Sequence, residues 1–247
     1  MTALKPVRKQ SLSDAVFEQL RDQIVSGAML PGAPLPAERV LCEALGVNRG
    51  SVREALKRLQ QSRLVSVRHG GTSHVLDYRA SGGLDLLADL IVTSAGRLDT
   101  RIIRGIVEMR SALAPDIARL AAERSRPAHC DALERTAAAM QAGAGDLPTL
   151  QGLAADFWSH LVDASDNLAY RLAYNSLRAT YDQCRDLFTQ VLAEEIGDVE
   201  CYRAIATAVR TRDAAAAETL ARELIRRGER GISRALRQLD QHQDHRP

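Results

Sequence analysis

The stretch GVNRGSVREALKRLQQSRLV, residues 46–65, combines a leading glycine, several basic residues and an apolar face. Its apolar residues recur at helical spacing and form one buried stripe, made of Val47, Val52, Leu56 and Leu59. Two interpretations compete. Such a pattern is often only a solvated amphipathic helix. It also suits a recognition helix, whose N-terminal residues reach base edges in a DNA major groove. The neighbouring sequence has to decide between them.

The residues before this stretch predict two further helices. SLSDAVFEQLRDQIVSG, residues 11–27, predicts a helix capped by Ser13 and ended by Gly27, with Val16, Leu20 and Ile24 on one face. Three prolines then exclude helix until residue 37. AERVLCEALG, residues 37–46, predicts a short helix that ends at its glycine. A short helix, a tight turn and a second, basic helix form the helix-turn-helix pattern.

The residues after the basic helix predict a β-hairpin. LVSV at 64–67 and SHVL at 73–76 alternate β-branched or apolar residues with polar ones, and the paired glycines Gly70 and Gly71 join them. Arg68 and His69 lie at the tip of this hairpin. Three helices followed by a hairpin make a winged helix, which favours the DNA-binding interpretation.

These residues resemble the DNA-binding domain of the GntR family of bacterial transcription regulators. LPxER, GVxRxxVREAL and a wing element RHGG occur in order within residues 11–76. The resemblance implies DNA contacts from PAER, the basic helix and the wing. Arginine suits guanine edges, and short polar side chains at a helix N-terminus suit phosphate. The predicted DNA-binding residues are Arg39, Asn48, Arg49, Ser51, Arg53, His69, Gly70, Gly71 and Thr72.

The charge distribution agrees with a basic DNA-binding head. Residues 1–80 carry 12 Lys and Arg against 7 Asp and Glu, and the remainder carries 21 against 24. The chain is 45% hydrophobic and 26% charged, with no apolar run of membrane-spanning length and no signal-like start, so we expect a cytoplasmic protein. The four cysteines are scattered, which favours free thiols over a disulfide framework or a zinc site.

The rest of the chain predicts an all-helical bundle. Helical patterns cover residues 84–94, 99–125, 127–141, 149–165, 167–192, 199–210 and 213–239, and Pro115 should bend the second of these. We therefore expect a mainly α protein with a winged helix-turn-helix at 1–76, a linker at 77–83 and a helical domain at 84–247.

The helical part resembles the FCD effector domain of the FadR subfamily. VEMRSALAPDIARLAAER and DFWSHLVDASDNLAYRL carry this resemblance. It implies a domain that forms a homodimer and binds an effector, with a fatty acyl-CoA as the effector of the most similar regulators.

Asp156 and His160 are four residues apart on one helical face and could share a metal ion. Many FCD domains add two later histidines, and the matching positions here hold Tyr202 and Leu224. Two ligands from one helix hold a divalent ion weakly, and such a pair is more often simply hydrogen-bonded. We therefore predict no metal and no cofactor.

An aromatic stripe is the second candidate effector feature. Its members fall at offsets 0, 4, 7, 11 and 18, close to one helical face: Tyr170, Tyr174, Leu177, Tyr181 and Phe188. Such a stripe is usually packed core, but it could equally line a cavity in which tyrosine hydroxyls meet a polar head group. With Asp156, His160 and Tyr202, these residues form the predicted effector site.

The sequence thus predicts a homodimeric repressor or dual regulator that binds a palindromic operator and senses a long-chain acyl-CoA or fatty acid. The alternative within this class is a small carboxylate effector, possibly held by a metal. An enzyme with a DNA-binding head, using Asp156 and His160 as acid and base, is a different class. No nucleophile, phosphate loop or complete ligand set accompanies that pair, so we expect no enzymatic activity.

Overall fold

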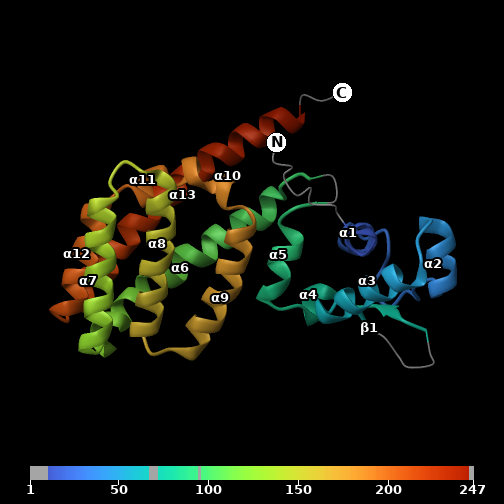
Figure 1. Cartoon of the computed structure of the whole chain (residues 1–247), viewed down its shortest axis with the longest axis horizontal. Coiled ribbons are helices and arrows are strands. Elements are labelled where there is room, and N and C mark those ends of the chain that lie inside the picture. Colours follow the sequence, from blue (N-terminus) through green and yellow to red (C-terminus); the bar gives the residue numbers. More distant parts are fainter. Residues whose placement is uncertain (1–10, 67–71, 94–95, 245–247) are drawn as a thin grey trace, which may run out of the picture. The chain divides into compact units, whose positions relative to one another are not determined.

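The computed structural model describes residues 11–66, 72–93 and 96–244, and divides the chain into two compact units, 1–98 and 99–247 (Figure 1). The first unit extends past the predicted linker at 77–83. That segment is partly helical, as α4 (Tyr78–Ser81), and is followed by η1 (Leu84–Leu86) and α5 (Leu87–Leu90). The buried side chain of Leu86 belongs to the core of the first unit, which explains why this segment stays with it.

Helix α1 (Leu12–Val25) begins at Ser11 and not at the predicted Ser13 cap. The Ser11 hydroxyl accepts a hydrogen bond from the backbone N–H of Asp14, and the Asp14 carboxylate accepts one from the backbone N–H of Ser11. This reciprocal capping box satisfies amide groups that the first turn leaves unpaired. The Ser13 side chain is instead buried and contacts the Ser11 hydroxyl.

The predicted helix-turn-helix is confirmed by α2 (Glu38–Leu45) and α3 (Arg49–Gln61). Gly46 joins them with a φ of 65°, a left-handed conformation that favours glycine. The predicted stripe of α3 is buried against α1, except that Val47 is only partly buried. The core of this unit also takes in the predicted face of α1, Val16, Leu20 and Ile24.

A short hairpin follows α3, as predicted. Strands β1 (Val65–Ser66) and β2 (His74–Val75) are antiparallel, with Val65 opposite Val75. The proline-containing segment before α2 pairs with the other side of β2, because the backbone N–H of Leu35 donates to the carbonyl of Ser73 at 2.8 Å. The hairpin is therefore anchored on both sides next to α3.

The second unit is a helical bundle (Figure 1). It contains α6 (Thr100–Arg124), α7 (Pro127–Ala142), α8 (Leu147–Ala164), α9 (Leu168–Gln183), α10 (Arg185–Val191), α11 (Ala193–Ile196), α12 (Val199–Arg210) and α13 (Ala214–Asp244). The two longest helices, α6 and α13, pack along each other, and α8 contacts α6, α7 and α9. Within the described ranges, every helix is too short or too polar to span a membrane.

The helix predicted over 167–192 is broken once, at Cys184, into α9 and α10, and it ends at Leu192 as predicted. The carbonyl of Arg185 accepts hydrogen bonds from the Gln151 amide at 2.9 Å and from the Thr189 hydroxyl at 3.2 Å. These side chains engage the backbone where the continuous helix was expected. Helix α6, by contrast, runs through Pro115, which is buried within it.

Candidate functional site

The N-terminus of α3 presents basic side chains on a buried core. Asn48 caps the helix, since its Oδ1 accepts a hydrogen bond from the backbone N–H of Ser51 at 2.9 Å. Arg49 and Arg53 are exposed, while Val52, between them, is fully buried. The core therefore fixes the helix, and both arginines are exposed to solvent.

Two of the predicted DNA-binding arginines form ion pairs on the surface. Arg53 donates from Nε to Glu38 at 2.9 Å, which links α3 to α2, and Arg39 pairs with Glu43 at 2.6 Å within α2. All of these groups are substantially exposed, so solvent screening keeps each pair weak. A phosphate or base edge can replace such a partner at small cost.

The predicted wing contacts are only partly described. His69, Gly70 and Gly71 lie outside the described residues. Thr72 is the first described residue after them and is exposed. It precedes β2, which pairs with β1, and β1 in turn contacts α3.

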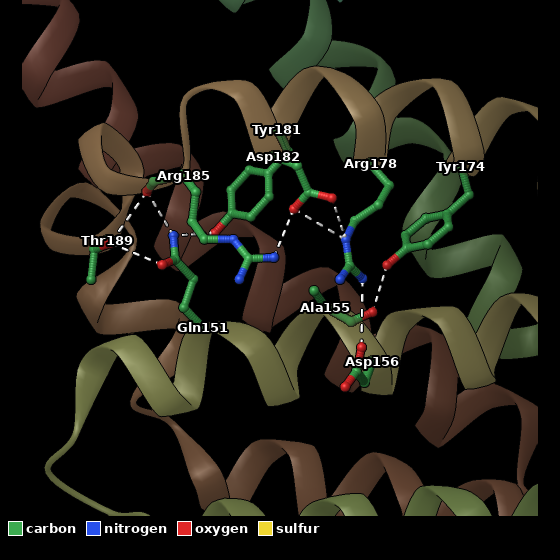
Figure 2. Close-up of polar contacts among 9 residues, drawn as sticks. All are labelled: Gln151, Ala155, Asp156, Tyr174, Arg178, Tyr181, Asp182, Arg185 and Thr189. Carbon is green, nitrogen blue, oxygen red and sulfur yellow. Dashed lines mark hydrogen bonds and ion pairs between the residues drawn. The ribbon is translucent and has the colours of Figure 1, made fainter. Parts of the chain in front are cut away.

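Asp156 and His160 lie on α8 as the spacing predicts, but Asp156 points toward α9. Its carboxylate is 3.7 Å from the guanidinium of Arg178, and its side chain is 59% exposed (Figure 2). Tyr202 and Leu224, at the positions of the two missing histidines, are fully buried. Among residues 11–66, 72–93 and 96–244, no three His, Cys, Asp or Glu side chains are grouped to hold a metal.

The predicted aromatic stripe joins α9 to its neighbours through its hydroxyls. Tyr170 donates to Asp116 of α6 at 2.7 Å, and Tyr174 donates to the carbonyl of Ala155 of α8 at 2.6 Å. Tyr181 accepts from the Gln151 amide at 2.6 Å (Figure 2). Each hydroxyl therefore already has a protein partner, which supports packing for this part of the stripe.

The far end of the stripe lies across the helix break. Phe188 belongs to α10, and its ring stacks on that of Tyr181 with centroids 5.8 Å apart. Leu177 is half-buried on α9. Burial raises the pKa of both Tyr174 and Tyr181, so these phenols stay protonated near neutral pH and act as hydrogen-bonding groups.

A largely buried polar group that the sequence did not single out joins four helices of the bundle. Arg110 of α6 donates a hydrogen bond to Glu195 of α11, whose side chain is almost fully buried. Tyr202 of α12 and Trp158 of α8 lie beside this pair. Burial raises the pKa of the Tyr202 hydroxyl, the charge of Glu195 adds to that effect, and Arg110 and the contact with Trp158 partly offset it. We call Arg110, Glu195, Tyr202 and Trp158 the interior polar centre.

The interior polar centre is incompletely satisfied. Glu195 Oε2, the Tyr202 hydroxyl and Trp158 Nε1 are buried without a well-formed hydrogen bond among the described residues. Burial raises the pKa of Glu195, and Arg110 partly offsets that effect. Buried polar groups are usually paired, so this cluster is an exception that calls for a functional explanation.

The chain belongs to two known sequence families along most of its length. Residues 12–75 match the bacterial regulatory proteins of the gntR family, and residues 105–227 match the FCD domain. It is a GntR-family transcriptional regulator. The matched ranges contain the basic N-terminus of α3 and the interior polar centre, and the family assignment confirms that the chain is a regulator and not an enzyme.

Named relatives agree with this assignment. The HTH-type transcriptional regulator Mce2R of Mycobacterium tuberculosis is 38% identical over 90% of this chain and 92% of its own length. The fatty acid metabolism regulator protein of Edwardsiella ictaluri is 29% identical over 71% of each chain. The solved structure of Lar from Listeria monocytogenes shares the fold at a TM-score of 0.50 and 17% identity, covering 94% of this chain and 99% of Lar.

Arg110 was within reach of sequence analysis, since it lies in the VEMR segment that carries the FCD resemblance. Glu195 could not be found from the sequence, because it lies 85 residues after Arg110, in a helix of only four residues. Gln151 and Thr189, whose side chains bond to each other at 2.9 Å, carry no periodic signal either.

Proposed function

We propose that this regulator acts in the cytoplasm as a homodimeric repressor that binds a palindromic operator and leaves it when a fatty acid or acyl-CoA enters the helical unit. Each α3 would occupy one half-site, since two-fold symmetry in the protein matches two-fold symmetry in the DNA. Exposed arginines at the N-terminus of α3 support the groove contact.

The interior polar centre is the observation that carries the effector proposal. It places the largely covered guanidinium of Arg110 next to the hydrogen-bond donors of Trp158 and Tyr202, which contact each other without a well-formed hydrogen bond. A ligand with a polar head and an apolar tail fits this chemistry, with the head at Arg110 and the tail among the aromatic side chains of α9 and α10. The name of the Edwardsiella ictaluri relative points to the same ligand class.

A small carboxylate held by a metal is the second candidate. Asp156 and His160 favour it because they share a face of α8, yet Asp156 pairs with Arg178 and two of the four expected ligands are replaced by Tyr202 and Leu224. An effector that binds without a metal needs only groups that the bundle already contains.

The effector would act by shifting a conformational population. It must bind the DNA-free arrangement more tightly than the DNA-bound one, and operator DNA must then weaken effector binding by the same factor. A coupling of about 1 to 3 kcal/mol changes DNA affinity roughly 5 to 150-fold.

The test titrates the protein on an operator duplex, selected with the protein from a random pool, in the presence of fatty acids and acyl-CoAs of increasing chain length. Long chains should release DNA and short ones should not. Tyr174→Ala and Tyr181→Ala should blunt the response, whereas Leu172→Ala, an exposed position on the same helix, should not. If the affinity for operator DNA is the same with ligands of every chain length, the fatty acid proposal is contradicted.

A further inference from the structure

The ion pair between Arg110 and Glu195 buries the Glu195 carboxylate almost completely, while the Arg110 side chain stays 27% exposed. Removing two charges from water is offset only when the geometry is good and the remaining donors and acceptors are satisfied. A guanidinium can donate hydrogen bonds to both oxygens of a carboxylate. Here Arg110 donates only to Oε1 of Glu195, and Oε2 has no hydrogen-bond partner among the described residues. Stability alone does not account for this arrangement.

The two partners differ in how firmly they are held. Arg110 lies within the 25-residue helix α6, which packs along α13. Glu195 lies on α11, a four-residue helix that begins after the break at Leu192 and ends at Gly197. A short element between two breaks can move with far fewer lost contacts than a long packed helix. Glu195 is therefore the partner that can leave.

The space around Glu195 is shaped for a carboxylate. Gly228 of α13 lies against Oε2, and a Cβ atom at that position would overlap it. Trp158 Nε1 and the Tyr202 hydroxyl contact each other without a well-formed hydrogen bond and lie on the same centre as the guanidinium of Arg110. One cation and two neutral donors converge on this region, a set that suits an anion with two oxygens.

We propose that Arg110 is an anion site occupied internally by Glu195, and that the carboxylate of the effector replaces it. This inference rests on the proposed function and names both the ligand group and its action. Displacement of Glu195 releases α11, so ligand binding is converted into movement of the α10–α11 segment. Of the two proposed effectors, this site selects the free fatty acid over the acyl-CoA, because a thioester, like an ester or an alcohol, has no carboxylate to exchange for that of Glu195.

Chemical rescue tests the site without knowledge of the effector. In Glu195→Ala, formate should fill the vacated position and raise the Tm above that in chloride of equal ionic strength. The variant should bind formate about tenfold or more tightly than wild type, since the internal competitor is gone. Glu194→Ala is the matched control, because Glu194 is the adjacent residue, is exposed and pairs with Arg234 on the surface. It should show no formate effect.

Two further variants complete the design. Adding Arg110→Ala to Glu195→Ala should abolish the formate effect. If Glu195→Ala does not fold, the isosteric Glu195→Gln should bind dodecanoate about tenfold more tightly than wild type and should discriminate dodecanoate from its methyl ester. These measurements use no DNA, so a failure of operator release would leave them unaffected. Formate and chloride acting alike on Glu195→Ala, or unchanged dodecanoate affinity in Glu195→Gln, would overturn the proposal.

Discussion

Individual arginines of α3 combine exposure with a fixed helical position. Arg49 and Arg53 contribute nothing to the core, whereas their neighbour Val52 is completely buried. Arg49→Ala and Arg53→Ala should each weaken specific operator binding by about 1 to 3 kcal/mol, because an exposed arginine can donate hydrogen bonds to a guanine edge. Both variants should keep the fold, because neither side chain packs in the core.

Gel-shift titration at fixed salt measures this effect, with circular dichroism to confirm folding. Arg79→Ala is the control, since Arg79 is an exposed arginine of the same unit on α4. Parental affinity in both α3 variants would mean that another surface reads the DNA.

The prediction that the protein binds no transition metal also depends on single residues. Asp156 is paired with Arg178 on the surface, and the buried Tyr202 ring packs edge-on against Phe157 at 5.1 Å. Elemental analysis of protein purified without added metal should find no stoichiometric zinc or nickel, because ligand number and geometry control such sites. One metal ion per chain that disappears in Asp156→Ala would refute this prediction.

At the scale of elements, the sequence predicted the first helix but placed its N-terminus at the wrong residue. The first helix begins two residues earlier than predicted because Ser11, and not Ser13, completes a capping box with Asp14. Both serines are acceptable caps by sequence, but Asp14 stands three residues after Ser11 and completes its box, whereas Ser13 is buried.

Close contact between α10 and α13 leads to a stability prediction. A Cβ at Gly231 would overlap the backbone carbonyl of Val191, while a Cβ at Gly105 in α6 would meet nothing within 4 Å. Gly231→Ala should lower the stability of the second unit by about 1 to 3 kcal/mol, as overpacking does. Gly105→Ala should raise it by about 0.5 to 1 kcal/mol through helix propensity.

Urea denaturation followed by circular dichroism compares these two variants directly. They make the same chemical change in the interior of a long helix, so opposite signs isolate the effect of the contact. Equal midpoints would show that α10 does not approach α13 as closely as described.

At the scale of the whole molecule, the expected homodimer sets the geometry of the operator. Two recognition helices related by a two-fold axis require half-sites about one helical turn, roughly 10 base pairs, or a multiple of it, apart. Insertion of about five base pairs between the half-sites turns one of them to the opposite side of the duplex and should reduce binding to that of a single half-site. Native mass spectrometry should find two chains per intact operator, and one chain per operator would contradict this prediction.

The sequence by itself determined the winged helix. Its signals are local: prolines that delay α2, Gly46 in a left-handed turn, and the apolar spacing of α3 each act within a few residues. Sequence patterns of this kind predict the structure correctly because they depend only on residues that are close together in the chain. The same reasoning correctly predicted the mainly helical second unit, since amphipathic periodicity marks each long helix.

Only the tertiary structure decided what lies inside that unit. Next to the break at Cys184, the carbonyl of Arg185 accepts a hydrogen bond from Gln151 of α8, and Tyr170 and Tyr174 find hydrogen-bond partners on other helices. The pairing of Arg110 with Glu195 joins positions 85 residues apart. Periodicity along one helix shows which face is buried, but it does not show which side chain of another helix will contact that face. The interior polar centre could therefore be identified only from the tertiary structure.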